Sequence, residues 1–181
     1  MDKKYELTDE KVFAYGHVLY RIKSCRSFGD VEAGQLGGYI ESETNLSHAG
    51  NCWVYGHAQI YGNAQIFGGV RILTHVQVFG NAQIYGTSQI YGNAQICGNA
   101  HVFGRARVFG NAVVSGNAQV FGRARVFGNA LVTGDSQIYG NAEIFQHINL
   151  NSGIWNKTIK VDNKYYLISS TLKVLKTDYD E

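Results

Sequence analysis

The stretch VFGRARVFGNA at residues 102–112 recurs letter for letter at residues 120–130, an offset of 18 residues. Around it, the chain reads from Val54 onward as consecutive six-residue units such as IYGNAQ and VFGNAQ, each beginning with isoleucine or valine. The fifth residue of nearly every unit is alanine, valine or serine. Because a fixed internal period is the signature of a repeat architecture, we expect one small structural unit to be stacked many times.

Each unit divides into a four-residue strand, such as AQIY, and a two-residue corner, which is usually Gly-Asn. Along the strand, alternation directs alanine and isoleucine inward and glutamine and tyrosine outward. Glycine tolerates positive φ at a corner, and asparagine is the next best residue there. An α-helix is excluded because glycine returns at every sixth residue. An amide ladder is expected where one corner repeats, at Asn63, Asn81, Asn99 and Asn117.

Three six-residue units make up the 18-residue repeat, so each coil is expected to have three sides. The predicted fold is an all-β, three-sided parallel β-helix. Outward residues of successive coils then fall into columns about 4.8 Å apart. The first face is expected to carry the pairs Trp53/Tyr55, Arg71/Leu73, Gln89/Tyr91, Arg107/Phe109, Arg125/Phe127 and Glu143/Phe145.

The two ends of the chain depart from the repeat. VFAYGHVLYRIKS at residues 12–24 alternates around Tyr15-Gly16 and predicts a β-hairpin, as does TIKVDNKYYLIS, with Asp162-Asn163 at its turn. LKVLK at residues 172–176 predicts a last strand. Short hairpin caps are expected because open coil ends are raw sheet edges. We divide the chain into an N-terminal hairpin cap (1–35), a hexapeptide-repeat β-helix (36–155) and a C-terminal hairpin and strand tail (156–181).

The unit [IV]-x-G-N-A-x resembles the hexapeptide-repeat, left-handed β-helix family, over roughly residues 18–155. The left hand is expected from this resemblance alone, since general crossover rules favour the right hand. The segment FGDVEAGQLGGYIESETNLSHAGNCWVYG, residues 28–56, resembles phage- and prophage-encoded members that are often labelled transferases. Family members commonly form trimers through their faces, so the resemblance also implies a homo-oligomer.

Composition narrows the function classes. The 181 residues include 22 glycines and no proline, and the net charge of +2 argues against an acidic DNA mimic. Cys25, Cys52 and Cys97 are widely spaced without a CxxC pair, so we predict neither a disulfide framework nor a metal site. The charged N-terminus and the lack of a long apolar run predict no signal peptide and no membrane partner. We expect a cytoplasmic protein, in the host bacterial cytoplasm if phage-encoded, without a cofactor.

Four arginines of the repeated stretch are expected to converge. Arg105 and Arg123 fall at successive corners, and Arg107 and Arg125 follow two residues on, on the first face. Like charges opposite each other in a sheet are destabilising, a cost that solvent, aromatic rings or a bound anion can relieve. The alternative that stays open is that one coil was duplicated together with its exposed arginines. The predicted binding residues are Arg105, Arg107, Arg123, Arg125, Phe109, Phe127, Arg71 and Tyr91.

We interpret the chain as a non-catalytic binding module of the phage type, with inhibition of a host bacterial defence system as its specific form. The partner would be an acidic host protein, a nucleic acid or a nucleotide. One alternative is a trimeric hexapeptide acyltransferase that uses an acyl-CoA donor, with His101 or His75 as base. It is less favoured because residues 54–153 contain no loop insertion and no evident carboxylate partner for these histidines. The other alternative is a self-assembling structural solenoid whose aromatic columns pack against copies of itself.

Overall fold

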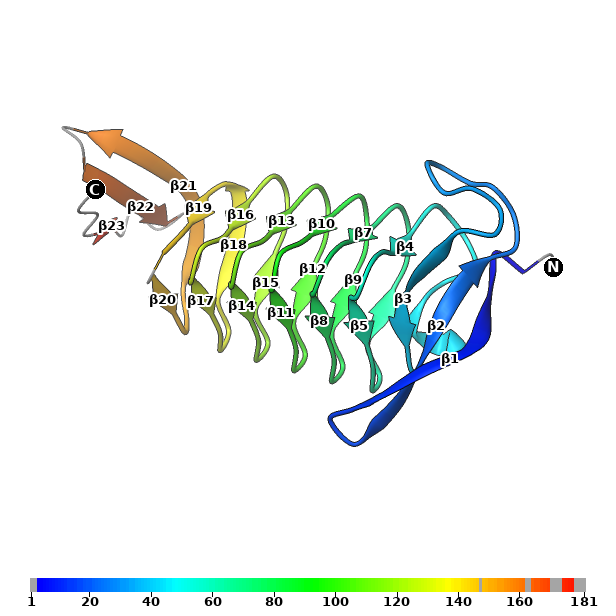
Figure 1. The fold of residues 1–181 in the computed structure, drawn as a ribbon. Coiled ribbons are helices and arrows are strands. Elements are labelled where there is room, and N and C mark those ends of the chain that lie inside the picture. The colour runs from blue at the N-terminus through cyan, green and yellow to red at the C-terminus, as the bar shows by residue number, and fades with distance from the viewer. Residues whose placement is uncertain (1–2, 147, 162–163, 170–173, 178–181) are drawn as a thin grey trace.

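The computed structural model of the chain describes residues 3–146, 148–161, 164–169 and 174–177. Strands run from one end of these residues to the other and coil into an elongated solenoid, which a hairpin closes at each end (Figure 1). The helical structure found in the described ranges is one 3-10 turn, η1 (Glu43–Asn45). It is far too short for a membrane span, and the described residues contain no helix that could cross a bilayer.

Three sheets form the sides of the solenoid. The first face is a six-stranded sheet of β4 (Trp53–Val54), β7 (Arg71–Ile72), β10 (Gln89–Ile90), β13 (Arg107–Val108), β16 (Arg125–Val126) and β19 (Glu143–Ile144). The second face continues from an N-terminal hairpin, in the order β1 (Tyr5–Ala14), β2 (His17–Ser24), β3 (Leu36–Ile40), β5 (Gln59–Ile60), β8 (Gln77–Val78), β11 (Gln95–Ile96), β14 (Val113–Val114), β17 (Leu131–Val132) and β20 (Asn149–Leu150).

The third face runs into the C-terminal hairpin. Its strands are β6 (Gln65–Ile66), β9 (Gln83–Ile84), β12 (His101–Val102), β15 (Gln119–Val120), β18 (Gln137–Asn141), β21 (Ile154–Val161), β22 (Lys164–Ser169) and β23 (Val174–Thr177). Within the coils, each strand pairs in parallel with the strand 18 residues further on, so that Arg107 lies opposite Arg125. The predicted three-sided coil and the expected occupants of the first face are therefore confirmed.

The core is a narrow column of small and branched side chains. Ala106, Val108, Ala112 and Val114 are all fully buried, as are the equivalent positions of the neighbouring coils. In each unit the buried residues are a small one, usually alanine, and two residues later an isoleucine or valine. The inward alternation predicted from the six-residue unit is confirmed, and hydrophobic burial along the axis is the main stabilising force.

The corners require glycine for two reasons. Gly110 has φ +72°, and a Cβ atom there would lie 2.9 Å from the amide nitrogen of Gly128 in the next coil. Thr74 occupies the same position of its own unit with φ +66°. Its hydroxyl oxygen lies 2.8 Å from both the amide nitrogen and the carbonyl oxygen of Gly92. A side chain is therefore accepted at this corner because its hydroxyl bonds to the backbone of the coil that follows.

Asparagine side chains form the predicted ladder along one edge. The amide of Asn63 donates to Asn81 at 3.0 Å, Asn81 donates to Asn99 at 3.0 Å, and Asn99 donates to Asn117 at 3.0 Å. Asn117 ends the ladder by donating to Asp135 at 2.9 Å. A second ladder at the next edge, through Asn93, Asn111 and Asn129, was not predicted, although the same 18-residue offset would have indicated it.

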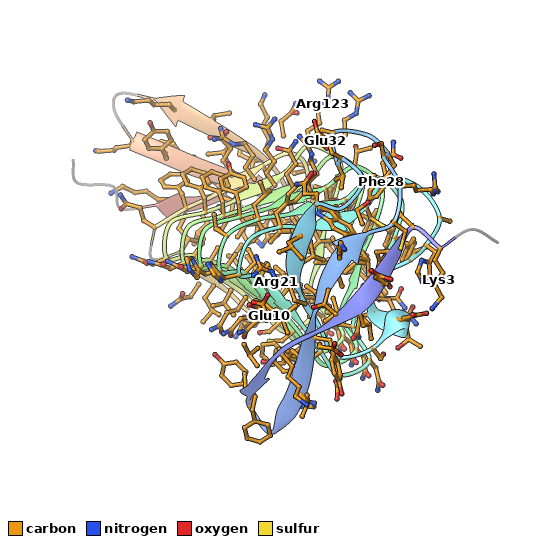
Figure 2. The ribbon with its side chains drawn as sticks, turned by 45° about the vertical axis from the view of Figure 1, so that its right-hand side comes forward. Lys3, Glu10, Arg21, Phe28, Glu32 and Arg123 are labelled. Atoms are coloured by element: carbon orange, nitrogen blue, oxygen red, sulfur yellow. The ribbon has the colours of Figure 1, made fainter. Side chains whose placement is uncertain are left out.

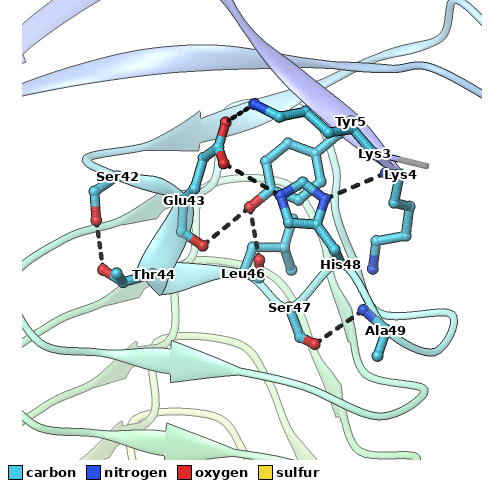
Figure 3. Close-up of polar contacts among 10 residues, drawn as sticks. All are labelled: Lys3, Lys4, Tyr5, Ser42, Glu43, Thr44, Leu46, Ser47, His48 and Ala49. Carbon is cyan, nitrogen blue, oxygen red and sulfur yellow. Dashed lines mark hydrogen bonds and ion pairs between the residues drawn. The ribbon is translucent and has the colours of Figure 1, made fainter. Parts of the chain in front are cut away.

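The N-terminal cap covers the carbonyl groups of the first coil. β1 and β2 form the predicted hairpin around Tyr15-Gly16, but β1 begins earlier than the sequence indicated, at Tyr5. The buried ammonium of Lys4 donates to the carbonyl oxygen of Cys52 at 2.9 Å, and burial lowers the pKa of Lys4 below its ordinary value. The Tyr5 hydroxyl donates to the carbonyl oxygen of Leu46 at 2.6 Å, with the His48 ring stacked on Tyr5 (Figure 3).

The C-terminal cap extends the third face. β21 pairs in parallel with β18 and then antiparallel with β22, which pairs in turn with β23. The predicted turn at Asp162-Asn163 and the first two residues of the predicted strand at 172–176 lie outside the described residues. Thr158 fastens this hairpin to the last first-face strand, because its hydroxyl accepts from the amide of Glu143 at 2.8 Å and lies 2.9 Å from the Glu143 carbonyl oxygen.

Candidate functional site

The four arginines of the repeated stretch line one depression on the solenoid. Its volume is about 270 Å³, and its lining consists of Arg105, Arg107, Arg123 and Arg125. Arg107 and Arg125 lie directly opposite each other in β13 and β16, and Arg105 and Arg123 occupy the corners just before these strands. Figure 2 shows Arg123 projecting from the outer edge of the coils. We call these four residues the arginine cluster.

Arg125 is the member of the cluster that the chain holds in place. Its Nη1 donates to Oε1 of Glu143 at 2.6 Å. Its guanidinium carbon lies 5.2 Å from the ring centroid of Phe127 and 5.6 Å from that of Phe109, within cation–π range. Its Nε is buried and has no acceptor in the part of the chain that the structure describes. Arg125 is therefore oriented by two rings and one carboxylate.

The other three arginines lack such restraints. The side chains of Arg105, Arg107 and Arg123 are exposed. Within the ranges that the structure describes, these side chains make no hydrogen bond or ion pair. The cluster thus combines one fixed, paired cation with three cations whose donors face solvent. Such a surface can accept an anion without breaking any contact of those three.

Two columns of stacked aromatic rings flank the cluster. On the first face, the centroids of Tyr91 and Phe109 lie 4.7 Å apart and those of Phe109 and Phe127 4.8 Å apart, with interplanar angles of 6° and 3°. On the third face, Phe103 and Phe121 stack in the same way at 4.8 Å. Because each ring covers the face of the next, the edges are the part turned outward, and aromatic edges carry positive partial charge.

Arg71 does not lie in the cluster, although it shares the first-face column. Its guanidinium forms an ion pair with Asp30, which also accepts from the Tyr55 hydroxyl at 2.9 Å. The guanidinium carbon lies 6.0 Å from the Tyr55 ring. The strand carrying Gln89 separates it from Arg107. The structure therefore assigns Arg71 to anchoring the loop between β2 and β3.

The two histidines considered as bases lie apart from each other. His101 is on β12, between Gln83 and Gln119 of the neighbouring strands. His75 stacks on His57 at 5.4 Å, at a corner. In the described part of the chain, neither histidine has a carboxylate partner within hydrogen-bond distance. The same ranges contain no group of three or more His, Cys, Asp or Glu side chains that could hold a metal ion.

Two further hollows depend on the caps and were missed by sequence reasoning. One, of about 350 Å³, lies where the N-terminal hairpin meets the second face and is lined by Tyr15, His57, Gln59, His75 and Gln77. The other, of about 200 Å³, is lined by Phe127, Glu143, Phe145 and Tyr165. The repeat register could not reveal either hollow, because each needs a residue from a cap.

Comparison with known proteins points to the same class of repeat. The sequence pattern of the YdcK beta solenoid repeat matches residues 100–116, 106–122, 118–134 and 124–140, which include the arginine cluster. A protein of Escherichia coli (strain K12) named "Uncharacterized acetyltransferase YdcK" is 39% identical over 61 residues. That alignment covers 29% of this chain and 19% of the relative, so the chain matches about a fifth of that protein's length. The fold and these matches define a β-solenoid built of hexapeptide repeats.

Proposed function

We propose that the protein is a non-catalytic binding module that engages an anionic partner through the arginine cluster and the edges of Phe109 and Phe127. The observation that carries the proposal is the single depression lined by four arginines, three of which have no acidic partner in the described residues. Like charges held in register cost stability unless a counter-charge is supplied. Glu143 supplies one such charge, and an outside anion would supply the rest.

The ring geometry disfavours single-stranded nucleic acid within this class. Binding of that kind depends on bases stacking on exposed aromatic faces. The rings beside the cluster cover one another at centroid separations of 4.7 and 4.8 Å, which leaves no room for a base between them. Edges with positive partial charge next to guanidinium groups suit carboxylate or phosphate oxygens instead. An acidic protein or a phosphorylated small molecule is therefore the favoured partner.

The narrower predictions about biology rest on the sequence alone, the cytoplasmic location on its composition and the others on the family resemblance. Inhibition of a bacterial defence system, a phage origin, a homo-oligomeric state and a cytoplasmic location all stay predictions.

An acyltransferase is the second candidate, because the aligned Escherichia coli protein carries that activity in its name. Among the described residues, neither His101 nor His75 has the carboxylate neighbour that commonly orients a histidine base. Calorimetry with acetyl-CoA separates the two functions when it includes the variant with glutamine at all four arginine positions, because coenzyme A itself carries phosphate groups. Binding that this variant retains would favour the enzyme, and no heat with the wild type would count against it. Light scattering tests the third possibility, a self-assembling solenoid, which requires long assemblies of the purified protein.

The proposed function is tested by capture from a nuclease-treated bacterial lysate. One variant carries glutamine at all four positions of the arginine cluster. A matched control loses the same number of positive charges at exposed lysines of the two caps, namely Lys3, Lys11, Lys23 and Lys176. A partner that is retained by the wild type and by the lysine variant, and lost by the arginine variant, supports the proposal. A partner that all three proteins retain, or no partner at all, overturns it.

A further inference from the structure

The cationic surface is compact. Arg105 and Arg107 belong to one coil, and Arg123 and Arg125 to the next. One coil earlier, the equivalent positions are Thr87 and Gln89, and one coil later they are Asn141 and Glu143. The positive charge therefore extends over two coils, which are about 4.8 Å apart. Along the first face, a long polyanion would meet the neutral Gln89 on one side of the two coils and the acidic Glu143 on the other.

The volume of the depression limits what it can enclose. At about 270 Å³ it is smaller than the pockets of about 300–1,000 Å³ that hold whole drug-sized ligands. It can take one small, highly charged group, while the remainder of a larger ligand stays on the surface. Because Arg107 and Arg125 are paired on neighbouring strands about 4.8 Å apart, their long side chains can reach the oxygens of one phosphate. The tetrahedral oxygens of a phosphate suit several guanidinium groups at once.

The charge balance favours phosphate over a single carboxylate. Four arginines and Glu143 leave a surplus of about three positive charges at neutral pH. One carboxylate would cancel one of them. A phosphate monoester carries about −1.5 to −2 at neutral pH and offers three acceptor oxygens, and a pyrophosphate carries more.

The Glu143 carboxylate is an anion of the chain itself that already binds one arginine of this site. Its carboxylate bonds to Arg125, while its backbone is fixed through the hydroxyl of Thr158. The Arg125 guanidinium also lies within cation–π range of the Phe109 and Phe127 rings, which are contacts that do not involve the carboxylate. A stronger anion can therefore displace the Glu143 side chain and find Arg125 already oriented.

We infer that the arginine cluster binds a phosphate monoester or pyrophosphate group, which replaces the Glu143 carboxylate on Arg125. This inference rests on the proposed function and names the chemistry of the anion. The group can come from free pyrophosphate or from the terminus of a nucleotide, so both sources belong in the test.

The test is calorimetric titration of the full chain with sodium pyrophosphate, adenosine diphosphate and sodium acetate at low ionic strength. Pyrophosphate should bind and acetate should not. Glu143→Gln should tighten pyrophosphate binding by about fivefold, the upper range for an exposed ion pair. A variant with lysine at all four arginine positions keeps the positive charge but loses the planar guanidinium groups that can donate two hydrogen bonds to one anion. It should bind pyrophosphate at least tenfold more weakly. The lysine-to-glutamine control should match the wild type.

The outcomes of this titration can be told apart from those of the lysate capture that tests the proposed function. Tighter binding of adenosine diphosphate than of pyrophosphate assigns the group to a nucleotide, and equal binding assigns it to the phosphates alone; both support the inference. No pyrophosphate or nucleotide binding overturns it, even where the lysate capture still depends on the arginines and the proposed function stands. Binding that survives removal of all four arginines, or that Glu143→Gln leaves unchanged, also overturns it.

Discussion

Replacing Gly110 by alanine should destabilise the solenoid by more than the cost of the positive φ angle alone. Gly110 has φ +72°, a region that costs a residue with a side chain about 1–2 kcal/mol. The new Cβ would also lie 2.9 Å from the amide nitrogen and 3.0 Å from the carbonyl oxygen of Gly128. Overpacking of this kind adds about 1–3 kcal/mol. After subtracting about 0.4–1 kcal/mol for the stiffer unfolded chain, the expected loss is about 1–4.6 kcal/mol.

Gly56→Ala is the matched control. Gly56 has φ +64°, but a Cβ there would find its nearest neighbour, the carbonyl oxygen of Thr74, at 3.5 Å, an ordinary contact. Only the conformational cost applies, so the expected loss is about 1 kcal/mol or less. Thr74 itself shows that a side chain can occupy this corner with φ +66°.

Urea denaturation followed by circular dichroism measures both variants against the wild type. The free energy of unfolding should fall by about 1–3 kcal/mol more for Gly110→Ala than for Gly56→Ala, the difference coming from the clash. Equal losses would show that close approach between coils does not select glycine at these corners. A neutral Gly110→Ala would refute the reasoning altogether, because neither the backbone cost nor the contact with Gly128 would then operate.

Three further substitutions probe the ladder, the hairpin and the N-terminal cap. Asn99→Ala removes the bonds from Asn81 and to Asn117 and should lower the free energy of unfolding by about 1 kcal/mol, read from the urea midpoint. Burial raises the pKa of Tyr61 to about 12, so the folded protein should lose stability as pH rises from 10 to 12, and a thermal melt series should show a smaller loss for Tyr61→Phe. Lys4→Met strands the buried carbonyl oxygen of Cys52 and should cost about 1–3 kcal/mol in urea, whereas the exposed Lys3→Met should cost little; equal losses would contradict the capping role.

The repeat made the coils predictable because two periods act on the same residues. Alternation fixes whether Ala106, Arg107 and Val108 point inward or outward, and the 18-residue offset fixes which residue of the next coil each one meets. Because every contact between coils joins residues 18 positions apart, the contacts can be predicted from the sequence without knowing the rest of the fold. The same two rules also account for the second asparagine ladder, which begins at the corner of Asn93.

Contacts made by the caps obey no such rule. Asp30 reaches Arg71 across 41 residues of sequence, and Tyr165 packs edge-on against Phe145 from the C-terminal hairpin. The register of the coils carries no signal for either contact, since Asp30 and Tyr165 lie outside it. This is why the sequence alone does not indicate the ion pair of Arg71 with Asp30 or the hollow beside Tyr165. Within the register, the column order placed Glu143 one coil beyond Arg125, but alternation alone does not decide that the two side chains bond.

Stacking each residue type on its own copy has opposite consequences for different side chains. Phenylalanine on phenylalanine gains a ring contact, as between Phe109 and Phe127, and asparagine on asparagine gains a hydrogen bond, as between Asn81 and Asn99. Both columns are therefore satisfied within the chain. Arginine on arginine gains only repulsion, and Arg107 opposite Arg125 is relieved by a single carboxylate at one end. In the described residues the positive charge of the arginine cluster is balanced only in part, by Glu143, and this is why we propose the binding role for the cluster and not for the longer aromatic columns.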